Sequence, residues 1–116
     1  MIPIRTVQST RRFYLLNTKS IRDDSIITMD DVYSTIHNNL VFLFGKNEFE
    51  SFGLEVKKYE LNVFVVSCVE KKAIGLRSGI FIPPNSSPNI ESWRIIGEAG
   101  FLQTLLHNSR DFFKPL

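Results

Sequence analysis

The sequence predicts an α+β fold with a four-stranded antiparallel sheet, one layer of helices and a short C-terminal helix. Three observations carry this prediction. Segments 11–20 and 60–70 are apolar on both of their alternating faces, which is typical of strands at the centre of a sheet. Segment 29–44 repeats apolar residues at helical spacing. The apolar segments and the polar connectors between them follow the order strand, helix, strand, strand, helix, strand.

Size and composition indicate one globular domain. The 116 residues suffice for a single hydrophobic core, and 43% hydrophobic with 22% charged residues is usual for such domains. We expect an extended arm at residues 1–10 and one α/β domain over residues 11–116. The formal net charge of +2 permits contact with RNA without indicating it. Residues 1–8 lack the apolar core of a signal peptide and no segment could span a membrane, so we expect a cytosolic or nuclear protein.

Both predicted central strands offer apolar side chains on two faces. In the first strand, Tyr14 and Leu16 share one face, while Phe13 and Leu15 share the other. In the strand at 60–70, one face carries Phe64, Val66 and Cys68 and the other carries Leu61, Val63, Val65 and Val69. A chain of this length has helices for one face only, so the other face needs a partner. We predict a protein interface made by Tyr14, Leu16, Phe64 and Val66.

The helix predicted at 29–44 has clear signals at both ends. Thr28, followed three residues later by Asp31, has the form of a capping box. Gly45 stands where a left-handed helix cap is expected. The apolar stripe between these ends consists of Val32, Ile36, Leu40 and Leu43.

Shorter patterns predict the remaining elements. Phe52, Leu54 and Val56 alternate with polar residues, which predicts an edge strand joined by the polar link 57–59 to the strand at 60–70. The further elements are a helix at 70–81, a proline-rich connector at 82–88, a strand at 91–98 and a terminal helix at 101–108. The resulting βαββαβ order is that of ferredoxin-like and RNA-recognition-motif (RRM-like) folds, in which strands one and three are central.

A stand-alone RNA-recognition module for single-stranded RNA is the alternative interpretation of this topology. Such modules expose aromatic side chains on the two central strands, and Tyr14 and Phe64 are the candidates in this sequence. Residues 62–69 contain no glycine and no basic residue, however, and so lack the signature expected on the third strand. A sheet face covered by a protein partner is therefore favoured.

Pairs of basic residues near strand ends are candidate RNA contacts. They are Arg11 with Arg12 and Lys57 with Lys58, each able to contact phosphates. Solvated surface charge explains any one of them equally well.

No pattern indicates catalysis, a metal site or a cofactor. His37 and His107 have no neighbouring nucleophile or carboxylate arrangement. Cys68, the single cysteine, excludes an internal disulfide and lies in an apolar strand, as buried thiols do. We predict no catalytic residue, no metal and no cofactor, so a small ferredoxin-like enzyme is the least favoured class.

The C-terminal sequence resembles a known family. Residues 93–111, WRIIGEAGFLQTLLHNSRD, resemble the end of the small α/β protein subunits of eukaryotic ribonuclease P and ribonuclease MRP. There a strand, a Phe-Leu helix and an Asn-Ser-Arg-acidic tail follow one another in the same way. The aromatic-Leu-Leu strand 12–16 and the helix end at 42–45 are also similar to this family. Arg110 is the basic residue that matches the family motif, and it joins the candidate RNA contacts.

The resemblance implies a non-catalytic role in a ribonucleoprotein. The RNA component is the catalyst of these enzymes, and the protein subunits help to build the particle that processes the 5′ leader of precursor tRNA and possibly ribosomal RNA. The resemblance also implies a heterodimer with a paralogous ribonuclease P subunit of the same fold, contacts with other ribonuclease P/MRP proteins, and direct or indirect contact with the catalytic RNA. It further implies a location in the nucleus, specifically the nucleolus, and no membrane.

Overall fold

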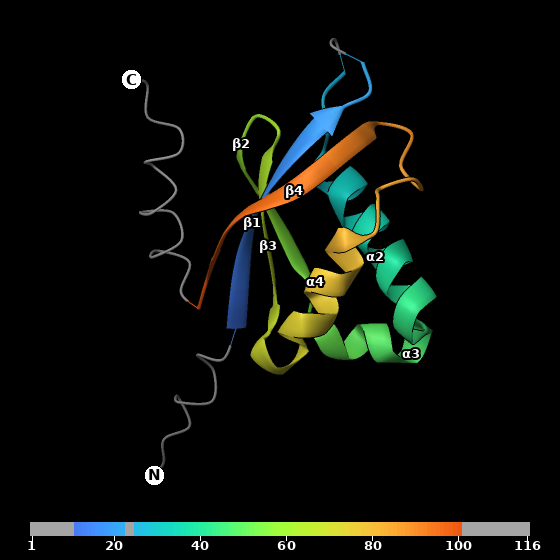
Figure 1. The fold of residues 1–116 in the computed structure, drawn as a ribbon, viewed down its shortest axis with the longest axis vertical. Helices are drawn as coiled ribbons and strands as arrows, with labels where there is room; N and C mark the ends of the chain where they lie inside the picture. Colours follow the sequence, from blue (N-terminus) through green and yellow to red (C-terminus); the bar gives the residue numbers. More distant parts are fainter. Residues whose placement is uncertain (1–10, 23–24, 101–116) are drawn as a thin grey trace.

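A four-stranded antiparallel sheet organises the structure, a computed structural model that describes residues 11–22 and 25–100 (Figure 1). The strands are β1 (Arg11–Ser20), β2 (Glu55–Glu60), β3 (Val63–Val69) and β4 (Ile90–Ala99). They are arranged in the order β2-β3-β1-β4, with every neighbouring pair antiparallel. The two doubly apolar strands, β1 and β3, are therefore central, as predicted.

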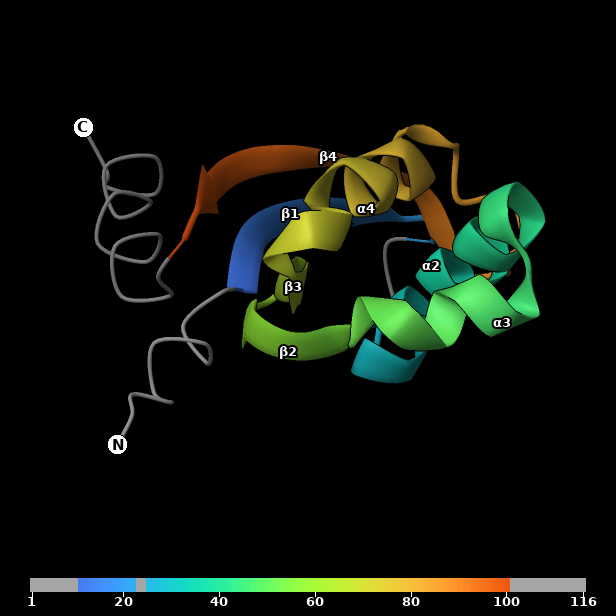
Figure 2. The same cartoon turned by 90° about the horizontal axis from the view of Figure 1, so that it is seen from below.

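Helices lie on one side of this sheet (Figure 2). They are α2 (Met29–Phe44), α3 (Lys46–Phe49) and α4 (Ala73–Phe81), with 3-10 turns η1 (Glu50–Phe52) and η2 (Glu70–Lys72) between elements. The α+β fold class and the ferredoxin-like βαββαβ order of the main elements are confirmed. The predicted arm at 1–10, the terminal helix at 101–108 and Arg110 lie outside the described residues.

The helix α2 begins and ends where its sequence signals predict. The Thr28 hydroxyl accepts from the Asp31 backbone N–H at 3.1 Å, and the Asp31 carboxylate accepts from the Thr28 N–H at 3.0 Å, which completes the capping box. Gly45 follows the helix with a φ of 94°, which favours glycine, but its ψ of 159° lies outside the left-handed helical region, so the predicted left-handed cap does not form. The buried stripe includes Val32, Ile36 and Leu40, which face the sheet and α4.

The hairpin formed by β2 and β3 is shifted along the sequence relative to the prediction. Phe52, expected in an edge strand, lies in η1 and is buried in the core. The expected polar link at 57–59 forms part of β2, which pairs with β3. The turn falls instead at Leu61–Asn62, where Asn62 has a φ of 65°. Asparagine tolerates this left-handed conformation better than most residues, so the turn did not need a glycine.

Close packing between α2 and α4 covers the sheet. Gly79 of α4 lies so near Leu40 that a Cβ atom at this position would come 2.5 Å from Leu40 Cδ2. The Asn39 side chain donates to the Gly79 carbonyl oxygen at 3.0 Å. Glycine is thus required at position 79 for the approach of the two helices, rather than for backbone freedom.

Candidate interaction surfaces

The four residues predicted as a protein interface form part of the core. Tyr14, Leu16, Phe64 and Val66 are each 0% exposed and pack in one cluster with Ile36, Leu40 and Leu76 of the helices. The interface prediction for these residues is therefore wrong. The alternating pattern showed that both faces of β1 and β3 are apolar, but it did not show which face the helices cover.

The same packing excludes the stacking platform of the alternative interpretation. Tyr14 and Phe64 would have to expose their rings to stack on RNA bases. Both rings are enclosed between the sheet and the helices, and the Tyr14 hydroxyl donates to the Ala73 carbonyl oxygen at 3.4 Å. They cannot contact RNA in the folded chain.

The other face of the sheet carries a second, smaller apolar cluster. Its buried members are Leu15, Val63, Val65 and Ala99, with Phe13, Tyr59 and Ile96 partly buried around them. Within residues 11–22 and 25–100, no helix or strand lies over this face (Figure 2). The predicted two-sided apolar character of β1 and β3 is thus confirmed.

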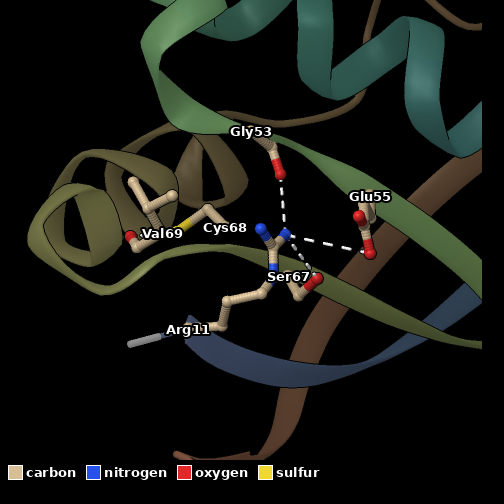
Figure 3. A network of polar contacts seen from close by, with 6 residues as sticks. All are labelled: Arg11, Gly53, Glu55, Ser67, Cys68 and Val69. Atoms are coloured by element: carbon tan, nitrogen blue, oxygen red, sulfur yellow. Dashed lines mark hydrogen bonds and ion pairs between the residues drawn. The ribbon is translucent and has the colours of Figure 1, made fainter. Parts of the chain in front are cut away.

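Arg11 joins three segments at one end of the sheet (Figure 3). Its Nη2 donates to the Gly53 carbonyl oxygen at 2.7 Å and to Ser67 Oγ at 2.9 Å, and it lies 3.9 Å from a Glu55 carboxylate oxygen. The guanidinium therefore ties β1 to β3 and to the turn that leads into β2. This residue, predicted as an RNA contact, has a structural role in the described part of the chain.

We expect the change Arg11→Met to lower the free energy of unfolding by about 1–2 kcal/mol, because a charged donor would no longer satisfy Gly53 and Ser67. The control is Lys19→Met, which removes an exposed cation 4.0 Å from Glu91 and should cost less than about 0.5 kcal/mol. Urea denaturation of both variants measures the difference. Equal losses would contradict a structural role for Arg11.

The other predicted RNA contacts divide into two kinds. Arg12 pairs with Glu98 across β1 and β4, with 3.1 Å between Nη2 and the carboxylate oxygen. Lys57 and Lys58 are exposed on the edge strand β2. Among the described candidates, these two lysines are the ones that no ion pair engages.

The buried thiol of Cys68 is held protonated by its surroundings. Burial raises the pKa of Cys68 from 9.0 to about 11, and burial likewise raises the pKa of Tyr14 from 10.0 to about 12. Both groups are neutral in the folded chain at neutral pH. The expectation that Cys68 is a buried structural thiol is confirmed.

We expect stability to fall at alkaline pH because of this thiol. Its contribution is fully present below pH 9, where the unfolded thiol keeps its proton, and is lost as the pH rises toward about 11. Chemical denaturation at pH 8 and at pH 10.5 should therefore show a larger loss for the wild type than for Cys68→Val. Since both proteins share every other titrating group, parallel losses would show that Cys68 does not contribute.

The remaining candidates for chemistry are few. His37 packs edge-on against Phe49, with 4.5 Å between ring centroids, and His107 lies outside the described residues. In the described part of the chain, no group of three His, Cys, Asp or Glu side chains could hold a metal ion. No helix of the described ranges is long and apolar enough to cross a membrane.

Large apolar side chains are exposed on the helical layer. Phe42 at the end of α2 and Ile74 on α4 are both 82% exposed, and Phe81 on α4 is 70% exposed. Leu43 and Phe44 are also exposed at the end of α2. We call these five residues the outer helical surface. Sequence patterns did not single out this surface, because Leu43 was predicted to lie in the buried stripe, and Ile74 and Phe81 fall within the helix predicted at 70–81.

Topology and packing together define a ferredoxin-like α+β protein with apolar groups outside its core. No protein-family model matches the chain, and a search of curated proteins finds no match. Among solved structures, the chain is similar to a chain in the cryo-EM structure of yeast ribonuclease MRP. The TM-score is 0.64, the sequence identity is 11%, and the likeness covers 91% of this chain and 95% of that chain. The two chains therefore share a fold over nearly their whole lengths.

Proposed function

We propose that this protein is a non-catalytic subunit of a ribonucleoprotein of the ribonuclease P or ribonuclease MRP type. The observation that carries the proposal is the fold shared with a chain of yeast ribonuclease MRP over 91% of this chain. The resemblance of residues 93–111 to small subunits of these enzymes supports it independently of the fold. In this role the protein helps to build a nucleolar particle whose RNA processes precursor tRNA and possibly ribosomal RNA.

The partner that we propose is a paralogous subunit with the same fold. The outer helical surface supports a protein partner, because Phe42, Ile74 and Phe81 expose large apolar groups that water solvates poorly. The four residues first predicted as the interface are core residues, so the proposed contact rests instead on the exposed apolar side chains of the outer helical surface. Other protein subunits and the RNA would complete the particle.

Pairing is tested by size-exclusion chromatography with light scattering. The chain is measured alone and after co-expression with the like-folded ribonuclease P subunit of the same organism, and we expect a stable one-to-one complex. The double variant Phe42→Glu, Ile74→Glu should weaken this complex without unfolding the chain, because both positions are 82% exposed. The control is Leu61→Glu, an exposed apolar position at the β2–β3 turn. If the chain stays monomeric and does not bind the other subunit, the proposed pairing is contradicted.

Lys57 and Lys58 are the candidate RNA contacts that we retain, because both are exposed on β2. In the complex with its partner, Lys57→Glu with Lys58→Glu should weaken RNA binding and reduce the dependence of log affinity on log salt by about 2, one per phosphate contact. Lys46→Glu on α3 changes an exposed lysine on the helical side and is the control. Filter binding at several salt concentrations gives both slopes. If the two variants show equal slopes of log affinity against log salt, Lys57 and Lys58 do not contact the RNA.

A further inference from the structure

A groove runs beside the outer edge of β4. Its cavity has a volume of about 490 Å³ and is bounded on one side by the consecutive residues 91–95 of β4. Arg77, Ile80 and Phe81 of α4, with Pro83 and Pro84, form the other side. Alternate residues of a strand point to opposite faces, so five consecutive lining residues place the groove along the backbone edge of the strand. We call this cavity the β4 groove.

The edge of β4 is available for pairing in the described part of the chain. β4 is the last strand of the sheet, with β1 on its inner side. The opposite edge strand, β2, has charged residues at four of its six positions (EVKKYE), a common protection against strand addition. β4 is longer and carries Trp93, Ile95 and Ile96 in its centre. It is therefore the less protected of the two edges.

The charge and the apolar lining of the β4 groove indicate which kind of ligand would bind there. Neither Arg77 nor Arg94 has a carboxylate partner within residues 11–22 and 25–100, whereas Glu91 lies 4.0 Å from Lys19. The walls are otherwise apolar, with Trp93, Phe81 and two prolines. An apolar cavity flanked by two guanidinium groups favours a large apolar side chain next to an acidic one.

Stacking of RNA bases is a poorer match to this groove. The Trp93 indole N–H donates to the Ile80 carbonyl oxygen at 2.7 Å and the ring packs against the core. The Arg77 guanidinium lies over the Phe81 ring, 5.7 Å from its centroid. The groove thus offers no open pair of aromatic faces for successive bases.

We propose that the β4 groove binds an extended segment of a partner protein. The segment adds to β4 as a fifth strand through backbone hydrogen bonds, places a large apolar side chain between Trp93 and Phe81, and directs an acidic side chain toward Arg77 and Arg94. Phe81 belongs both to this groove and to the outer helical surface, so the two sites adjoin, but strand addition to β4 does not require the pairing with a like-folded subunit.

The probe is a phage-displayed library of random twelve-residue peptides, selected on the full-length chain. We expect the enriched peptides to share a large apolar residue beside an acidic one. Trp93 is the single tryptophan of the chain and lines the groove. Binding of a synthetic copy of an enriched peptide should therefore shift the fluorescence emission of Trp93. Arg77→Glu with Arg94→Glu should weaken this binding at least about tenfold. Phe81→Ala should weaken it as well, while Ile74→Ala on the same helix should not.

Three outcomes would overturn the proposal. The first is a selection that enriches no peptide. The second is an enriched peptide that leaves Trp93 emission unchanged or binds the two-arginine variant equally well. The third is a uridine oligonucleotide that displaces the peptide and shifts Trp93 emission with the same dependence on the two arginines, because the groove would then be an RNA site. All three measurements use the chain without its like-folded partner, so they stand apart from the test of pairing.

Discussion

Replacement of Phe64 by alanine should lower the free energy of unfolding by about 3–5 kcal/mol. Phe64, the second residue of the central strand β3, is 0% exposed and packs beneath the helices with Tyr14 and Val66. Removal of the ring leaves a cavity that the central strands cannot close. A loss of this size is a large part of the total stability of a small domain.

The matched control is Phe81→Ala, which removes the same ring from a position that is 70% exposed. It should change the free energy of unfolding by less than about 0.5 kcal/mol. Thermal and urea denaturation of both variants separate the two cases. If Phe64→Ala left stability unchanged and instead abolished binding to a partner, Phe64 would belong to an interface and the core assignment would be wrong.

The change Gly79→Val should destabilise the protein by about 1–3 kcal/mol through overpacking between α2 and α4. The new Cβ would come 2.5 Å from Leu40 Cδ2 and 3.1 Å from Leu40 Cγ, and Leu40 is fully buried. The added side chain therefore has no space unless the helices separate. Arg77→Val introduces the same valine side chain at an exposed position of the same helix, where no buried neighbour is displaced, and should cost much less.

A second-site change tests the cause of this loss. Leu40→Ala alone should destabilise the protein, but in the background of Gly79→Val it should recover part of the loss, because the smaller side chain makes room for the valine. Denaturation of the two single variants and the double variant gives the coupling free energy. Additive losses would show that residues 40 and 79 do not compete for the same space.

Much of the fold could be predicted because its signals are local. The capping box of Thr28 and Asp31 marks the start of α2, and the two-sided apolar pattern of β1 and β3 places them at the centre of the sheet. The β2–β3 turn was misplaced because its left-handed residue is Asn62, which strand patterns do not separate from a polar strand position.

The candidate interface was harder to predict, because it depends on which sheet face the helices cover. Tyr14 and Leu15 are adjacent residues that could each be buried, and only the three-dimensional packing shows that Tyr14 faces α4. The β4 groove joins residues of α4, the proline-rich connector and β4, so no single stretch of sequence contains it. Long-range packing, rather than local preference, determines both features.

The most direct test of the proposed function is affinity purification of the tagged full-length protein from its own cells, followed by quantification of the bound RNAs. We expect the ribonuclease P or ribonuclease MRP RNA to be enriched over an untagged control, together with a like-folded protein subunit. The tagged Phe64→Ala protein, whose core we expect to be strongly destabilised, should recover much less of both. If the folded, tagged protein enriches neither RNA above the untagged control, it is not a subunit of such a particle and the proposal is contradicted.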